Sequence, residues 1–150
     1  MKRGEVISRK DFKFSNGSIT EKLLIVLNEA GPNRPHLLLF TTSKKWRRKD
    51  IPGCHSKDNY YVIPKDTDWF NSMTWVLFDL IIEYDFSKEL QEHFQGKLIT
   101  ETILRENTIR SIINCLKLSE DVSPYQLSLL EAAEQEELVR IKSERKNEQP

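Results

Sequence analysis

The stretch "KLLIVLNEAGPNRPHLLLFTTS", Lys22 to Ser43, decides the fold, because it holds two apolar runs separated by a turn-forming segment. The first run ends at Asn28 and the second begins at His36, with Gly31 and two prolines between them. Apolar runs of this length occur in buried helices as well as strands, but the glycine and prolines that follow at once favour strands. We therefore expect two buried strands joined by a short connection.

Further segments of strand length lie on both sides of this pair. An Asn-Gly turn supports a tight hairpin between the first two strands, because both residues tolerate positive φ. Short connections are typical of antiparallel sheets, so we expect a compact sheet that curls on itself. These strands are predicted at Glu5–Phe14, Asp58–Pro64 and Thr74–Asp85, with the first turn at Ser15–Ser18.

The last third of the chain changes its hydrophobic period. Apolar residues at helical spacing predict a helix over Thr100–Leu118, with Thr100 as its N-cap. A second helix is predicted to start at Pro124 and run to about residue 146, and its end frays into a polar tail over Ser143–Pro150. The fold class is therefore mainly β with one or two C-terminal helices (β+α). Residues 1–118 would form the main unit and residues 119–150 an addition to it.

The overall composition does not indicate any binding partner. Among 150 residues, 23 are Lys or Arg and 23 are Asp or Glu, so only local charge can indicate a ligand. The first residues do not resemble a signal peptide, and no apolar run reaches membrane-spanning length, so we expect a cytoplasmic protein that uses no membrane. Cys54 and Cys115 lie far apart in sequence, and neither a disulfide nor a metal site follows from them.

Positive charge is concentrated directly after the second buried run. Hydroxyl groups at the end of a strand can donate to phosphate oxygens, and the lysines and arginines that follow suit phosphate as well. The tryptophan among them could stack on an unpaired base. The alternative is a solvated loop whose tryptophan folds onto the sheet. The stretch consists of Thr41, Thr42, Ser43, Lys44, Lys45, Trp46, Arg47, Arg48 and Lys49.

The three histidines have no spacing that suits a metal site, so no metal or other cofactor is expected. His36 and His55 flank the basic stretch in sequence, and either could act as an acid or base in phosphodiester cleavage. The alternative for each is a surface position or a hydrogen-bonded place in the core. The aromatic residues of Trp69-Phe70 and Trp75 are predicted to pack in the core.

The order of these segments resembles the MazF/PemK (Kid) toxin family. The resemblance covers roughly residues 2–118, and the order of the pieces is more specific than any one of them. The matching segments are "KRGEVI" (Lys2–Ile7), "EKLLIVLN" (Glu21–Asn28), "LLLFTTS" (Leu37–Ser43), "WFNSMTWVLFDLIIEYDFSKEL" (Trp69–Leu90) and "GKLITETILRENTIRSIINCLKL" (Gly96–Leu118).

This resemblance implies an SH3-like small barrel and a metal-independent endoribonuclease that cleaves single-stranded RNA. It also implies a homodimer and a small antitoxin partner. Lys22 stands at the position of the family's catalytic arginine, and Thr42 fits its catalytic threonine, with Thr41 as the neighbouring candidate. Lysine lacks the bidentate fork of arginine, and Met73-Thr74 replaces the family's Asp-Ser pair.

Two other functions are consistent with the same residues. A non-catalytic barrel could bind nucleic acid through the basic stretch alone. Alternatively, the protein could be an interaction module whose acidic helix, residues 124–146, binds a partner or a second copy of the chain.

Overall fold

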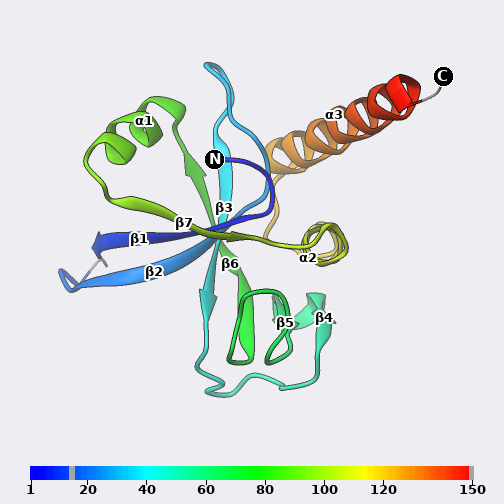
Figure 1. The fold of residues 1–150 in the computed structure, drawn as a ribbon. Helices are drawn as coiled ribbons and strands as arrows, with labels where there is room; N and C mark the ends of the chain where they lie inside the picture. Colours follow the sequence, from blue (N-terminus) through cyan, green and yellow to red (C-terminus); the bar gives the residue numbers. More distant parts are fainter. Residues whose placement is uncertain (14–15, 149–150) are drawn as a thin grey trace.

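The computed structural model describes residues 1–13 and 16–148 (Figure 1). These residues form a seven-stranded antiparallel sheet, three α-helices and one short 3-10 helix. The elements are β1 (Glu5–Lys13), β2 (Ile19–Val26), β3 (His36–Thr42), β4 (Gly53–His55), η1 (Ser56–Asp58), β5 (Tyr60–Ile63), β6 (Thr74–Tyr84), α1 (Phe86–Phe94), β7 (Leu98–Ile103), α2 (Glu106–Lys117) and α3 (Pro124–Glu148).

The predicted fold class, mainly β with C-terminal helices, is confirmed. The hydrogen-bonded order is β4-β5-β6-β3-β2-β1-β7, which leaves β4 and β7 as unpaired edges in the described part of the chain. The sheet is therefore not closed into a barrel, and the SH3-like barrel is not confirmed. The pair predicted from Lys22–Ser43 lies at the centre as β2 and β3, which pair in register from Leu24↔Phe40 to Val26↔Leu38.

Both faces of the central strands are buried, because their side chains alternate between two apolar clusters. The first face, which includes Ile25 and Leu39, packs against α2 and the first turns of α3. The second face includes Leu24 and Leu38. Helix α1 contributes the buried side chains of Glu89 and Glu92, which bond to residues of the second face. A strand that is buried on both faces has a continuous run of apolar residues in its sequence, and β2 and β3 both contain such a run.

The helix predicted over Thr100–Leu118 is wrong at its start. Residues Leu98–Ile103 form the edge strand β7, which pairs with β1, and α2 begins only at Glu106. Several β-branched residues in "LITETI" favour a strand, since they fit a pleated surface better than a helix. Thr100 is therefore not an N-cap.

Two further differences concern the other helices. Helix α1 was not predicted, although Asp85 caps it by accepting a hydrogen bond from the Ser87 amide at 2.8 Å. The predicted polar tail is helical as far as Glu148, and Arg140 supports it through an ion pair with Glu144 at 3.0 Å, one helical turn away. Pro150 and the residue before it lie outside the described residues.

The turn predicted at Ser15–Ser18 is described only from Asn16 onward. Gly17 has a φ of 87°, and the Ser18 amide donates to the Asn16 side chain at 3.0 Å, as the turn chemistry requires. Phe14 and Ser15 lie outside the described residues.

The structure contains a disulfide that the sequence did not predict. Cys54 of β4 and Cys115 of α2 are joined by a disulfide, with their Cα atoms 5.5 Å apart and a sequence separation of 61. Cysteine spacing carried no signal, because the two residues meet only when α2 packs against the sheet edge. The bond ties α2 to the short strand β4.

Reduction of this disulfide should destabilise the protein. Opening a loop of this length removes about 4 kcal/mol of stabilisation in the chain-entropy description. We expect the free energy of unfolding in urea to fall by about 2–4 kcal/mol when a reductant is added. In the control, Cys54→Ala with Cys115→Ala, the reductant should change nothing. Equal midpoints for the oxidised and reduced wild type would contradict the prediction.

Candidate functional site

A shallow groove lies between the middle of β2 and the end of β3, where the chain leaves β3. It has a volume of about 300 Å³, and we call it the strand-end groove. Lys22, Thr41 and Thr42 all line it, so the structure brings together three of the four residues predicted to act in catalysis, and His36 is the exception. Its lining residues are Glu21, Lys22, Leu23, Thr41, Thr42, Ser43, Lys44, Phe70 and Thr74.

The strand register places Lys22 and Thr42 on the same face of the sheet. Leu24 pairs with Phe40, and both belong to the second face. Because side chains alternate along a strand, Lys22, two residues before Leu24, and Thr42, two residues after Phe40, project from that same face. Neither residue is sealed in the interior, since both are partly exposed.

The two neighbouring threonines differ in their environments. Thr41 is buried, and its hydroxyl donates to the Leu23 carbonyl at 3.0 Å. The Thr42 hydroxyl instead accepts a hydrogen bond from the Lys44 amide at 3.2 Å. Because an accepting hydroxyl still carries its own proton, Thr42 can donate to a ligand in the groove. The geometry therefore favours Thr42 over Thr41 as the acting hydroxyl.

The basic loop, Lys44–Lys49, leaves β3 and lies against the second face. Its end is held there by two hydrogen bonds: the Lys49 amide donates to the Tyr60 hydroxyl at 2.8 Å, and the Trp75 indole donates to the Lys49 carbonyl at 2.8 Å. Tyr60 and Trp75 are both buried. The loop is thus anchored to the sheet instead of hanging free in solvent.

Trp46 stands at the tip of the basic loop with 77% of its surface exposed. The guanidinium groups of Arg47 and Arg48 lie 5.4 and 5.9 Å from its ring centroid, within the range of cation–π contacts. The alternative of a tryptophan folded onto the sheet is therefore not what the structure contains.

Some charges of the basic loop are already paired. Lys45 pairs with Asp50 at 3.5 Å, and Lys49 pairs with Asp58 at 3.0 Å, which raises the pKa of Lys49. Within the described residues, the remaining cations Lys44, Arg47 and Arg48 have no ion pair with a carboxylate. Three positive charges are therefore available to an anionic ligand.

The basic loop also lines a second cavity of about 420 Å³, which we call the loop pocket. Its lining combines cations of the loop with the carboxyl-bearing residues Asp58 and Asp79. Tyr60 and Leu77 of the sheet line it as well. The loop pocket and the strand-end groove have no lining residue in common.

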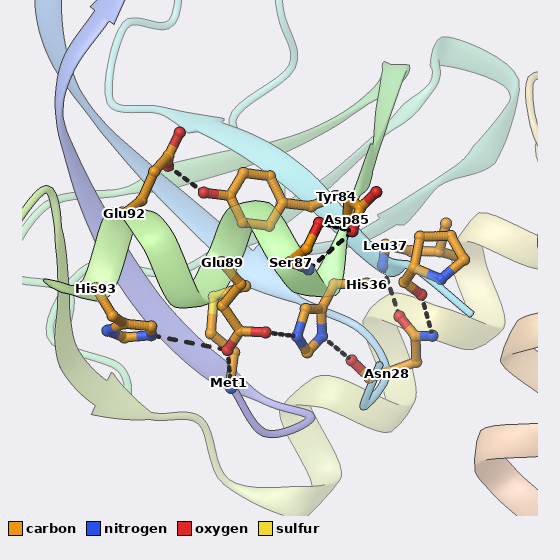
Figure 2. A network of polar contacts seen from close by, with 11 residues as sticks. Met1, Asn28, His36, Leu37, Tyr84, Asp85, Ser87, Glu89, Glu92 and His93 are labelled. Carbon is orange, nitrogen blue, oxygen red and sulfur yellow. Dashed lines mark hydrogen bonds and ion pairs between the residues drawn. The ribbon is translucent and has the colours of Figure 1, made fainter. Parts of the chain in front are cut away.

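His36 lies away from both cavities. It begins β3, whereas Thr42 ends it, and six residues of extended chain span about 20 Å. The side chain is buried beneath α1, with Nδ1 2.9 Å from the Asn28 carbonyl and Nε2 2.6 Å from a carboxylate oxygen of Glu89 (Figure 2). Both ring nitrogens face acceptors, so neither is presented to a substrate in the groove.

His36 instead belongs to a buried polar network that attaches α1 to the sheet (Figure 2). Glu89 receives contacts from the amino group of Met1 at 2.5 Å and from His36, and Glu92 bonds to the Tyr84 hydroxyl and to Arg9. Burial tends to raise the pKa of Glu89, but these hydrogen bonds and charges lower it below its ordinary value. The same kind of burial, with the Glu92 carboxylate, raises the pKa of Tyr84.

His55 also lies outside the lining of the strand-end groove. Its Nε2 atom is 2.6 Å from the Ile51 carbonyl, and its ring is tilted against Tyr60 with the centroids 5.2 Å apart. The described residues contain no group of three or more His, Cys, Asp or Glu side chains that could hold a metal ion. Among the described helices, none is both long and apolar enough to cross a membrane.

Sequence reasoning missed two residues of this region. Glu21 brings a carboxylate to the strand-end groove, and its position beside Lys22 was the only signal. Trp69, predicted to be core, is 42% exposed, whereas Phe70 and Trp75 are buried as predicted. Alternation of apolar residues could not have revealed this, because Trp69 lies on a connection and not on a strand.

The lowered pKa of Glu89 makes the attachment of α1 sensitive to pH. A carboxylate whose pKa is lower in the folded state stabilises the fold above the unfolded pKa, about 4.3, and loses that effect as the pH falls through the folded value. We expect Glu89→Gln to lower the free energy of unfolding at pH 7 by about 2 kcal/mol. When the pH is lowered from neutral to acidic, the free energy of unfolding should fall less in this variant than in the wild type. Urea titrations at each pH measure this difference.

The control is Glu131→Gln, which changes an exposed carboxylate on α3. It should leave both the stability at pH 7 and its acid dependence as in the wild type. Identical acid dependence for Glu89→Gln and the wild type would show that this network does not hold α1.

No protein-family model, curated protein or solved structure matches this chain. The resemblance to the MazF/PemK family therefore stays a prediction, and the function has to be argued from the geometry of the groove and the loop.

Proposed function

We propose that the protein is an endoribonuclease that cleaves single-stranded RNA in the strand-end groove without a metal ion. One observation carries the proposal: Lys22 and Thr42, which come from different strands, line one groove directly before the basic loop. An ammonium group and a hydroxyl group in one groove can contact the same phosphate. The adjoining cations Lys44, Arg47 and Arg48 would draw the polyanion to it.

The proposed chemistry is the one that the resemblance to the MazF/PemK family implies. The ribose 2′-hydroxyl attacks the adjacent phosphorus, its proton leaves, and the bond from phosphorus to the 5′ oxygen breaks. The products are a 2′,3′-cyclic phosphate and a 5′-hydroxyl. In this scheme Glu21 accepts the proton of the 2′-hydroxyl, and Lys22 stabilises the added negative charge and protonates the leaving oxygen. Thr42 donates to a non-bridging oxygen.

Substitutions in the groove test this scheme. We expect wild-type protein to cleave a long unstructured RNA in the presence of a metal chelator, leaving 5′-hydroxyl ends. Lys22→Ala, Thr42→Val and Glu21→Gln should each lower the cleavage rate by about a hundredfold or more, because each removes a group that acts on the transition state. Lys22→Arg keeps the charge and should retain most of the rate.

The matched control is Lys142→Ala, which removes an exposed lysine from α3. Cleavage that is absent in the wild type, or that persists in Lys22→Ala at the rate of this control, would remove the nuclease proposal.

A non-catalytic module that binds nucleic acid is the second candidate. The observation that favours it is the lysine at position 22, since an ammonium group lacks the planar fork that holds a phosphate in two places. Binding of RNA without turnover, by a wild type that loses affinity with the basic-loop charges, would support it over the nuclease.

The basic loop can be tested for either candidate through its salt dependence. For single strands, the logarithm of affinity falls with the logarithm of salt concentration by about 0.7 per neutralised phosphate. Replacing Lys44, Arg47 and Arg48 by glutamine should therefore reduce that slope by about 2. The control replaces the α3 residues Lys142, Arg145 and Lys146, and should keep the wild-type slope. An unchanged slope in the loop variant would exclude this loop as the RNA contact.

We further propose that the protein forms a homodimer and binds a small antitoxin protein, as the resemblance to the MazF/PemK family implies. We also propose that it is located in the cytoplasm. Helix α3 supports a protein contact, because it projects from the body of the molecule with Leu138 and Val139 exposed (Figure 1). Light scattering tests the dimer against the 17.7 kDa of one chain. The disulfide between Cys54 and Cys115 bears on the proposed location, because the cytoplasm keeps most thiols reduced. Thiol labelling in intact cells tests it: two labelled cysteines would support the cytoplasm, and protection of both by the disulfide would contradict it.

A further inference from the structure

The connection from β5 to β6 presents an aromatic pair at its end. Phe70 is buried in the first-face cluster, and the exposed ring of Trp69 meets it edge to face, with the centroids 5.6 Å apart at 71°. Trp69 thus rests on a core side chain while part of its surface remains in solvent. An indole ring that is held in place by a core side chain can serve as a surface on which another aromatic ring stacks.

Asp68 holds this connection rigidly against α2. Its carboxylate, which is almost fully buried, accepts hydrogen bonds from the Arg105 amide and guanidinium at 3.0 Å and from the Thr108 hydroxyl at 2.7 Å. The Phe70 amide also donates to the Thr67 carbonyl at 3.1 Å. The position of Trp69 is therefore determined by neighbours on both sides in sequence.

Trp69 lines a cavity of about 300 Å³ that we call the aromatic pocket. Four of its residues, Leu23, Ser43, Phe70 and Thr74, also line the strand-end groove. Two cavities that share four lining residues lie next to each other. The aromatic pocket is completed by Trp69, Asn71 and Ser72.

The two neighbouring cavities differ in chemistry. The strand-end groove carries Lys22 and Lys44 with hydroxyl groups, which suits a phosphate. The aromatic pocket combines the partly exposed indole of Trp69 with the amide of Asn71, which can donate and accept at the edge of a planar ring. A nucleotide joins these two chemistries, because it carries a phosphate beside an aromatic base with a hydrogen-bonding edge.

We propose that the aromatic pocket holds one base of a single-stranded RNA, stacked on Trp69 and contacted at its edge by Asn71, next to the phosphate in the strand-end groove. This inference rests on the proposed function, and it makes Trp69 and Asn71 residues that select the substrate. Stacking on aromatic side chains is how proteins commonly hold unpaired bases, and an amide can discriminate among base edges.

Binding to oligonucleotides tests the inference separately from cleavage. Oligomers with 2′-deoxyribose at every position lack the attacking hydroxyl, so fluorescence anisotropy reports affinity alone. Trp69→Leu should weaken binding about 5-fold to 100-fold, in line with the loss of one base–aromatic stack. Trp69→Phe should retain most of the affinity. Asn71→Ala should reduce the difference in affinity among adenine, cytosine and thymine homopolymers.

The control is Phe94→Leu, which changes an exposed aromatic residue on α1 and should leave the affinity unchanged. Equal affinity of Trp69→Leu and the wild type would overturn the inference while leaving the proposed function in place. An equal loss in Trp69→Leu and Trp69→Phe would also overturn it, because stacking would then not be the cause. A wild type that neither binds these oligomers nor cleaves RNA would remove the proposed function itself.

Discussion

The structure depends on the burial of both faces of β2 and β3. Leu24 to Leu27 and Leu37 to Leu39 are almost completely excluded from solvent, although adjacent side chains point to opposite faces. Every part of this surface therefore needs a cover, since exposed apolar surface costs about 25 cal/mol per Å². Helix α2 and the start of α3 cover the first face, while α1 and the basic loop cover opposite ends of the second.

The candidate site lies where this burial ends. Polar side chains replace apolar ones in the first half of β2 and at the end of β3, so that Lys22 and Thr42 are partly exposed without entering the core. Because the basic loop must return across the second face to start β4, its cations are held beside these residues. The same requirement that covers the sheet thus concentrates positive charge near the groove.

The elements that cover the sheet are held in place by specific polar and covalent contacts in addition to apolar packing. Glu89 joins α1 to the start of β3 through His36, the disulfide joins α2 to β4, and Asp68 joins the start of α2 to the connection that carries Trp69. These contacts lie at the two ends of the sheet. They explain why His36 serves the structure at one end while Thr42 is available at the other.

The sequence by itself determined the class of the fold and the two central strands, because continuous apolar runs beside Gly and Pro identified β2 and β3. Lys22 and Thr42 were named from the family resemblance alone. The pairing of β2 with β3, which the tertiary structure supplies, is what brings the two residues to one groove. The strand β7, the disulfide and the position of His36 were decided by the tertiary structure alone. Each depends on a contact between distant segments: Ile7 with Thr100, Cys54 with Cys115, and His36 with Glu89. Local periodicity reports which side of an element is apolar, but not which distant element will cover it.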